Sequence, residues 1–471
     1  MQTARRWTFL RWLTPVAVLA AAATPAAAEP LTPDQALARA ATRSPELRAT
    51  LHDLEAAKAS MDGEAMARDP RLTAGVHATH STRDSIDASV GVRTTTDLGT
   101  VIDVGVDAAF DSGPSQSATV GIDVRQPLLR GAGQDSVLAA LRQARIARTQ
   151  SEIERDRIAT QVAAAVLEAY WEVWFAAQAL DVERAQLALT ERQLDEVRKK
   201  VDVLKTLPAI EALRLESQRA SQVSALSQAE ASLEQAQIGL ARLLGVSYAE
   251  AGAIVAAAAP TTAADVEPLA ALIGLAEAES YELRIRRLDL EANRIGLADA
   301  QSASRPKLDL VGALSAGLLW DDQFDGFEWR GGRPGIIAMI GLEGELPFGR
   351  GSEDARLDGA RARQRAAEAR YEAQREELGA QVARTRRALV QAIQAATLSE
   401  TNARVARELA EREADKLRLG TAVLTDLVIA QQSARDAELQ LLRARVAVET
   451  TRNTLDELTG TLLARLALTP N

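Results

Sequence analysis

Residues 118–141 read ATVGIDVRQPLLRGAGQDSVLAAL, and within this stretch a strand pattern gives way to a helix pattern. Every second residue from Ala118 to Val124 is apolar, as in a strand with one apolar face. From Asp135 to about residue 200 there is neither proline nor glycine, and apolar residues recur at three- and four-residue steps. At 1.5 Å per residue such a helix is on the order of 100 Å long. We therefore expect it to pack on other helices as a coiled coil.

The same order of elements occurs twice along the chain. Ser44–Leu47 corresponds to Ser280–Leu283, a shift of 280 − 44 = 236 residues, and Gln126–Gly131 corresponds to Leu346–Gly351, a shift of 346 − 126 = 220. The predicted divisions are a signal peptide over 1–28, a first repeat over 29–250, a linker over 251–265 and a second repeat over 266–466.

Each repeat is predicted to contain a helix, a group of strands, a long helix and a returning helix. In the first repeat the strands cover about 71–126, the long helix about 135–200 and the return helix about 208–245. In the second repeat the corresponding ranges are about 307–346, 352–419 and 424–466.

The N-terminus has the features of a secretory signal peptide. Arg5, Arg6 and Arg11 precede or border an apolar core over 12–23, and a small-residue site ends at Ala28 before Glu29. The alternative is a retained anchor, but the apolar core is short for a spanning helix. We expect cleavage between Ala28 and Glu29 and export. Any later membrane crossing would then be made by strands.

Composition excludes several functions. Removing the signal peptide leaves 55 − 3 = 52 basic residues against 65 acidic ones, a formal charge of −13, which argues against nucleic-acid binding. No cysteine is present, so disulfides and thiolate metal sites are excluded. The sequence contains neither a Gly-Lys-Ser/Thr phosphate loop nor a G-x-S-x-G nucleophile motif. We predict no enzyme activity, no catalytic or metal-binding residue and no cofactor.

The strand segments alternate apolar and polar residues, as the strands of an outer-membrane barrel do. They are too few to close a barrel within one chain, so several chains would have to share it. A soluble sandwich with the same alternation is the alternative. Segments 86–95 and 100–110 either add strands to the barrel or form an extra hairpin above the membrane.

Taken together, these pieces resemble the TolC-like outer membrane efflux protein family over nearly the whole chain after the signal peptide. The resemblance is carried by the repeat, the junctions at Gln126–Gly131 and Leu346–Gly349, the Ala169-Tyr170-Trp171 step, and Leu419-Gly420-Thr421 followed by Thr425-Asp426-Leu427. The family pattern has a single hairpin in the first repeat, where this chain has two further alternating segments.

The resemblance implies a mainly α fold with two tandem repeats, in which a long coiled-coil periplasmic tunnel carries an outer-membrane β-barrel shared by a homotrimer. It implies a passive duct in the outer membrane of a Gram-negative bacterium, surrounded by outer-membrane lipid. The expected partners are a periplasmic adaptor (membrane fusion) protein and an inner-membrane transporter of RND or ABC type, in efflux or type I secretion. The alternative is a periplasmic coiled-coil structural protein without a pore. The cargo is left open.

The resemblance also points to two sets of candidate residues. The periplasmic gate would lie at the tip turn, at Leu417, Gly420, Thr421, Leu424, Asp426 and Ile429. The strand-to-helix junctions would lie at Pro127, Gly131, Pro347 and Gly351. In the best-known family member, Ala422 and Ile429 are a basic and an acidic residue, and an aromatic replaces Leu417. We therefore expect apolar closure of the tip with Asp426 at the constriction, the alternative being a local role for Asp426 at the helix start.

Overall fold

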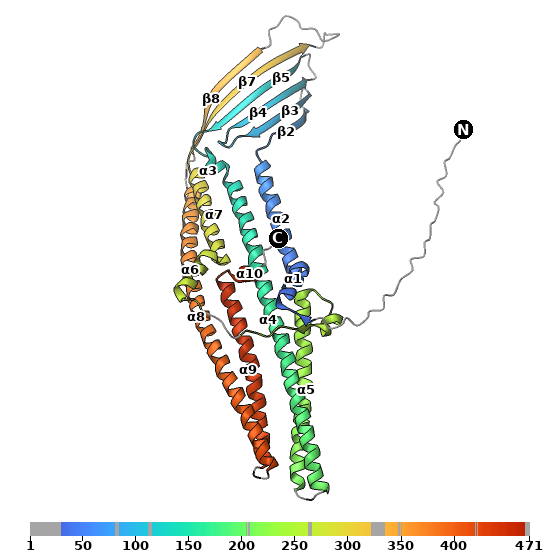
Figure 1. Cartoon of the computed structure of the whole chain (residues 1–471). Coiled ribbons are helices and arrows are strands. Elements are labelled where there is room, and N and C mark those ends of the chain that lie inside the picture. The colour runs from blue at the N-terminus through green and yellow to red at the C-terminus, as the bar shows by residue number, and fades with distance from the viewer. Residues whose placement is uncertain are drawn as a thin grey trace, which may run out of the picture.

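The computed structural model describes residues 30–466 except 81–83, 112–114, 204, 206–207, 262–265, 322–334, 347–348, 350, 420 and 422. The described chain is an elongated body with a β-sheet at one end and the turns of two long helical hairpins at the other (Figure 1). The predicted signal peptide and its cleavage site at Ala28 and Glu29 lie outside the described residues, as do Pro347 and Gly420.

The first repeat begins with strand β1 (Pro30–Leu31) and helices α1 (Pro33–Arg43) and α2 (Pro45–Met66). Thr32 and Gln35 form a capping box at the start of α1, each side chain bonding to the backbone of the other. Four strands follow: β2 (Arg71–Thr79), β3 (Ser85–Thr95), β4 (Val101–Asp111) and β5 (Ser115–Pro127). After the short α3 (Gln134–Val137) come the long α4 (Ala139–Arg198), a π-helical turn (Lys199–Val203) and the returning α5 (Ala209–Leu244).

A 3-10 turn (Tyr248–Ala253) and strand β6 (Val255–Ala256) connect the repeats. The second repeat contains α6 (Leu269–Glu279), α7 (Tyr281–Ala303), strands β7 (Lys307–Asp321) and β8 (Gly335–Glu345), and the hairpin of α8 (Gly351–Arg418) and α9 (Leu424–Leu458). It ends with α10 (Leu462–Arg465).

Two expected elements differ in detail. The predicted return helix over 424–466 is interrupted after Leu458, because Gly460 adopts the left-handed φ of +70° and α10 starts anew. The predicted linker contains structure of its own. Its strand β6 pairs in parallel with β1, so the start of the described chain is bound to the connection between the repeats.

The two repeats share one antiparallel sheet with the strand order β2-β3-β4-β5-β7-β8. The seam between the repeats is the pairing of β5 with β7, from Ser115↔Asp321 to Pro127↔Asp309. Segments 86–95 and 100–110, whose place was open from sequence, are β3 and β4. They lie within the sheet, paired on both sides, and not apart from it.

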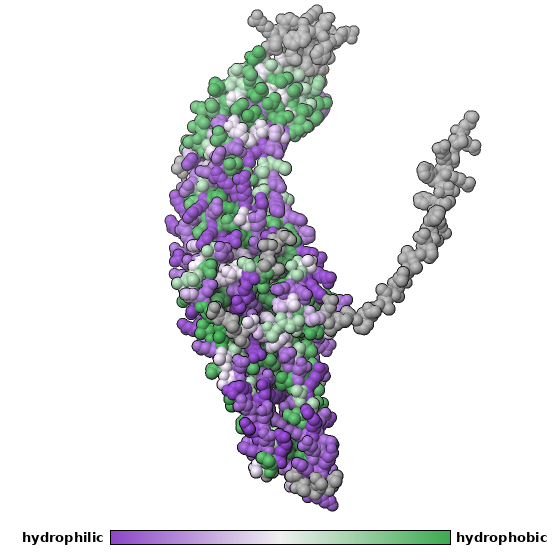
Figure 2. Space-filling model, in the orientation of Figure 1, coloured by the Kyte–Doolittle hydropathy of each residue, from purple (hydrophilic) through white to green (hydrophobic). Residues whose placement is uncertain are grey.

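One face of this sheet is apolar and uncovered. Opposing residues such as Val90, Val106 and Val120 share it across three strands, and all are exposed. Hydrophobic residues gather over the sheet end in Figure 2, whereas the helical part is largely hydrophilic on the same face. An apolar surface of this extent marks a contact with lipid or protein.

The core lies among the helices, halfway along the molecule. Helix α4 contributes more residues to the main cluster than any other element, and its Val166, Tyr170 and Val173 are fully buried against α1, α5 and the C-terminal segment. A second cluster joins Leu283 of α7 to Val382 of α8 and Val448 of α9. The pairs α4 with α5 and α8 with α9 form the two long hairpins, and α4 also packs against α9. None of the described helices is both long enough and apolar enough to cross a membrane.

Candidate functional site

The predicted tip residues that the structure describes lie at or beside the turn between α8 and α9, at the end of the molecule opposite the sheet (Figure 1). The backbone N–H of Thr421 donates to the carbonyl oxygen of Lys416 at 2.9 Å, and the Thr421 hydroxyl donates to the same oxygen at 3.1 Å. These bonds satisfy a carbonyl that the end of α8 would leave free. Asp426 is exposed in the first turn of α9.

The two hairpin turns meet through a small apolar cluster. Leu424 of α9 is buried with Leu194 and Val197 of α4 and Leu215 of α5, and Leu417 packs against them. Two polar contacts lie beside this cluster. Arg214 donates to the Thr425 hydroxyl at 3.0 Å, and the Gln432 amide donates to the Gln218 carbonyl at 2.9 Å. The tips of the two repeats are therefore in contact within one chain.

The structure brings only some of the tip residues together. Leu417 and Leu424 join the cluster, whereas Ile429 is exposed on another face of α9. Asp426 and Thr421 are also exposed. Within one chain, the apolar packing predicted for the tip therefore comes from Leu417 and Leu424 and not from Ile429.

The junction of β5 with the long helix is built on two glycines. Gly131 and Gly133 adopt left-handed φ angles of +77° and +85°, which side chains disfavour, and Gly133 precedes α3. The Gly131 N–H donates to the Ser302 hydroxyl at 3.3 Å, which fixes the junction to the end of α7. In the second repeat, Gly351 is the first residue of α8.

Pro127, at the predicted strand-to-helix junction, is the last residue of β5. Pro127 is paired with Asp309, and the N–H of the following Leu128 donates to the Leu308 carbonyl at 2.8 Å. Because bonds to one neighbour alternate along an antiparallel strand, the Pro127 nitrogen faces the side of β4. The β4 ladder starts only at Val101, opposite Arg125, so the missing donor of Pro127 leaves no ladder bond unmade.

An ion pair between the repeats was missed from the sequence. Glu183 of α4 accepts two bonds from Arg435 Nε of α9, at 2.8 and 3.0 Å, and one from its Nη2 at 2.5 Å. The Glu183 side chain is 5% exposed and that of Arg435 is 27% exposed. The hydrogen bonds that Arg435 donates to Glu183 raise the pKa of Arg435 above its ordinary value. One signal was available: Glu183 occupies the apolar series that includes Val173, Leu180 and Leu194.

Tyr170 joins three segments that are distant in sequence. Its hydroxyl donates to the Leu31 carbonyl and accepts from the Ala258 N–H, both at 2.9 Å. Burial raises the pKa of Tyr170, so the hydroxyl keeps its proton over the working pH range. Trp171 packs edge-on against the same ring, with 5.0 Å between centroids. The aromatic step quoted from the sequence thus anchors β1 and the connecting segment to α4.

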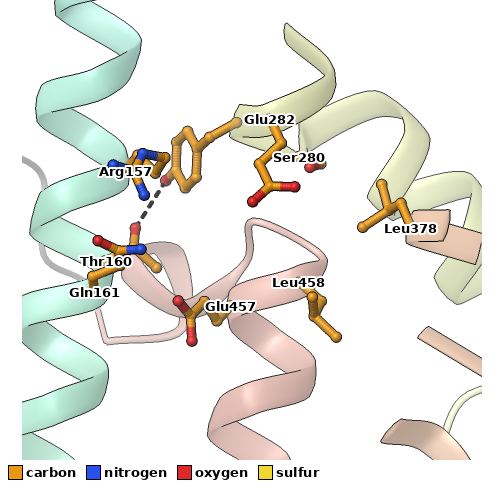
Figure 3. A pocket seen from close by; sticks show the side chains of 9 residues that line it. Arg157, Thr160, Gln161, Ser280, Glu282, Leu378, Glu457 and Leu458 are labelled. Atoms are coloured by element: carbon orange, nitrogen blue, oxygen red, sulfur yellow. Dashed lines mark hydrogen bonds between the residues drawn. The ribbon is translucent and has the colours of Figure 1, made fainter. Parts of the chain in front are cut away.

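A small cleft lies where α4, the start of α7, α8 and the end of α9 meet (Figure 3). Arg157 donates to Glu154 at 2.7 and 2.5 Å, and these bonds lower the pKa of Glu154. Burial raises the pKa of Glu457, and the nearby charge of Glu282 raises it further. Tyr281 receives a hydrogen bond from Thr160 at 3.3 Å. The cleft is a polar contact between the repeats, and across the described residues no cluster of His, Asp and Glu is arranged to hold a metal.

These features define a class of protein: two repeats of long helical hairpins that jointly carry an antiparallel sheet with an exposed apolar face. Residues 36–246 and 272–461 match the family described as outer membrane efflux protein, and the chain belongs to that family. It is therefore an outer-membrane protein with a large periplasmic helical part. No curated protein matches the sequence significantly.

Several solved structures share the fold. A membrane protein from Pseudomonas aeruginosa superposes with a TM-score of 0.69 at 19% identity, covering 91% of this chain and 90% of that one. The outer membrane protein VceC from Vibrio cholerae gives 0.69 at 16% identity, with 91% and 96% covered. The open state of the outer membrane channel MtrE from Neisseria gonorrhoeae gives 0.65 at 19% identity, with 91% and 89% covered. The predicted mainly helical fold with two tandem repeats is confirmed.

Proposed function

We propose that the protein is a homotrimeric outer-membrane duct that passively conducts cargo through its own length to the cell exterior. The observation that carries this proposal is the sheet of six strands, which exposes an apolar face and has two open edges, β2 and β8. Closing the sheet with those of other copies would satisfy both edges and place the apolar face in lipid. The family match and the MtrE channel fold support the same reading.

The helical hairpins would continue this barrel as a tunnel into the periplasm. The face of the hairpins seen in Figure 2 is largely hydrophilic, as expected of helices in the aqueous periplasm. Their turns would contact a periplasmic adaptor protein and an inner-membrane transporter of RND or ABC type. Cargo selection would then belong to that transporter. The alternative is a coiled-coil envelope protein without a pore, which would leave the apolar face of the sheet exposed to water.

Two measurements test the duct. Native mass spectrometry of the detergent-extracted protein should show a trimer, and the same preparation should give discrete conductance steps in planar lipid bilayers. A monomer that stays soluble without detergent and conducts no ions would refute the proposal and favour the structural protein.

We further propose that the tip turns close the periplasmic end and that Asp426 lies at the constriction. In a trimer, one exposed carboxylate per chain near the axis would form an acidic ring, and acidic rings favour cations. Asp426→Ala should then reduce cation selectivity and block by multivalent cations in bilayers while the trimer stays intact. An Asp426→Ala channel with lower thermal stability but unchanged selectivity would leave Asp426 only its role at the start of α9.

A further inference from the structure

We infer that the duct closes its outer-membrane end with eighteen strands, six from each of three chains, by pairing β2 of each chain with β8 of the next. This inference rests on the proposed trimeric duct and specifies the surface by which its copies meet. It assigns β3 and β4 to the barrel wall, although the family pattern quoted from sequence has a single hairpin in the first repeat.

The lengths and faces of β3 and β4 are those of membrane strands. Each has 11 residues, and a tilted strand needs about 9–11 to cross the hydrocarbon layer. Their apolar residues continue the surface of the neighbouring strands in register, as in the row of Val104 on β4, Ile122 on β5 and Leu314 on β7. All three side chains are exposed. A hairpin lying in water above the membrane would be expected to have polar residues at these positions, and not to continue the apolar face.

The two edge strands of the sheet, β2 and β8, have the features of strands that pair with another chain. Leu72 on β2 is 75% exposed and Ile340 on β8 is 80% exposed, against 44% for Val104 inside the sheet. Neither edge strand contains the proline or lysine with which proteins commonly protect an open edge. Strand direction alternates through the sheet, so β8 of one copy would meet β2 of the next in antiparallel orientation.

Charge at the helix-proximal ends of the two edges is complementary. Arg71 on β2 is in register with Arg93 of β3, a like-charge pair, and Arg93 is itself bonded to Asp103 at 2.6 Å. Glu343 and Glu345 lie at the corresponding end of β8, on the polar face. Within the chain they pair with Arg125 at 2.8 Å and Arg130 at 3.5 Å. A neighbouring copy would bring these carboxylates beside Arg71, on the side opposite Arg93.

Strand number sets the width of the duct. With neighbouring strands about 4.8 Å apart and tilted by about 40°, each strand adds about 6.3 Å to the circumference. Eighteen strands then give a backbone diameter of about 36 Å, and twelve would give about 24 Å, a ratio of about 1.5. Barrels of 16–18 strands enclose an aqueous channel. The exit of this duct would therefore be wider than its constricted tip, and would not limit the size of the cargo.

Cysteine cross-linking in the full-length trimer tests the pairing of β2 with β8 of the next chain, because the chain contains no cysteine of its own. Thr73→Cys on β2 is combined in turn with Met339→Cys, Gly341→Cys and Glu343→Cys on β8, which share the polar face and span the possible registers. At least one combination should give covalent trimers on oxidation. The matched controls combine the same three β8 cysteines with Asp103→Cys on β4. Strand β4 would pair with β8 of the next chain if only β4, β5, β7 and β8 formed the barrel wall. These controls should stay uncoupled.

Cross-linking from Asp103, or from neither position in a protein that is trimeric, would overturn the inference and leave the duct standing. A protein that is not trimeric would instead refute the proposed duct. Electron microscopy of the trimer gives a second, independent reading: eighteen strands in cross-section support the inference, and twelve contradict it.

Discussion

Replacing Arg435 with methionine should loosen the contact between the two hairpins more than replacing its partner Glu183 with glutamine. Glu183 would remain as an uncompensated carboxylate with a side chain only 5% exposed. Breaking a fully buried pair costs about 3–5 kcal/mol, and because Arg435 is partly exposed we expect about 2 kcal/mol here. Glu183→Gln should cost about 1 kcal/mol, since the glutamine still accepts a hydrogen bond and Arg435 keeps its contact with Asp436.

Hydrogen exchange measured by mass spectrometry on the trimer reads these local free energies from peptides of α4 and α9. A cost of 2 kcal/mol corresponds to about 30-fold faster exchange for Arg435→Met, and 1 kcal/mol to about 5-fold for Glu183→Gln. The double variant Glu183→Leu with Arg435→Met should return close to the parent rate, because no buried charge remains. Arg404→Met is the matched control, since Arg404 pairs with Glu408 in an exposed position on α8 and should change exchange less than about 2-fold.

The reasoning fails if Arg435→Met exchanges no faster than Arg404→Met. It also fails if the double variant exchanges as fast as Arg435→Met alone. The cost in free energy would then come from lost packing and not from an unpaired carboxylate.

Three further outcomes are expected. Tyr170→Phe leaves the half-buried Ala258 N–H without its partner, at about 1–3 kcal/mol, whereas the Leu31 carbonyl keeps its bond from the Ala257 N–H. Limited proteolysis should therefore cut the N-terminal segment before α2 sooner, and unchanged cleavage would contradict this. The raised pKa of Glu457 favours its protonated form in the folded protein, so its contribution to stability is present at low pH and lost as pH rises through the folded pKa. Glu457→Gln should therefore raise the thermal midpoint near neutral pH, but not at a pH below the ordinary pKa of glutamate. Equal increases at the two pH values would point to another cause. Leu215→Ala, in the cluster that joins the tips, should cost about 2–4 kcal/mol and increase the frequency of channel opening in bilayers, whereas stable closed channels would show that other contacts hold the tip.

Much of the fold could be predicted because its elements are long and strongly periodic. A helix such as α4, with 60 residues, repeats its apolar pattern many times, and the strands alternate cleanly. Shorter features carry too little pattern. The two-residue strands β1 and β6 could not be recognised, and Tyr170, which bonds to both segments, lies more than 80 residues from either strand.

The candidate site was less accessible from the sequence, for reasons that differ among its residues. Which strands pair depends on contacts between distant segments, so the place of β3 and β4 was open until the sheet order was known. Glu183 interrupts an apolar series, which marks it as unusual, but the helical period does not identify Arg435 as its partner. At the tip, the family resemblance drew attention to α8 and α9, whereas the cluster is completed by Leu194, Val197 and Leu215 of the other hairpin.

The contacts that join the two hairpins within a chain differ in strength, and this difference locates the part that can open. The polar contacts of Arg214 and Gln432 at the tip are exposed, so each contributes on the order of 0.5 kcal/mol. The apolar cluster around Leu215 contributes several times more, at about 25 cal/mol per Å² of buried surface. Glu183 lies 198 − 183 = 15 residues before the end of α4, a distance of about 22 Å along the helix, and it is paired with Arg435 through three hydrogen bonds. Separation of the tips breaks the apolar cluster and the exposed polar contacts. We therefore expect opening motion to be confined to the part of the hairpins between the tip turns and the Glu183–Arg435 pair, with the main core cluster around Tyr170 and the sheet unchanged.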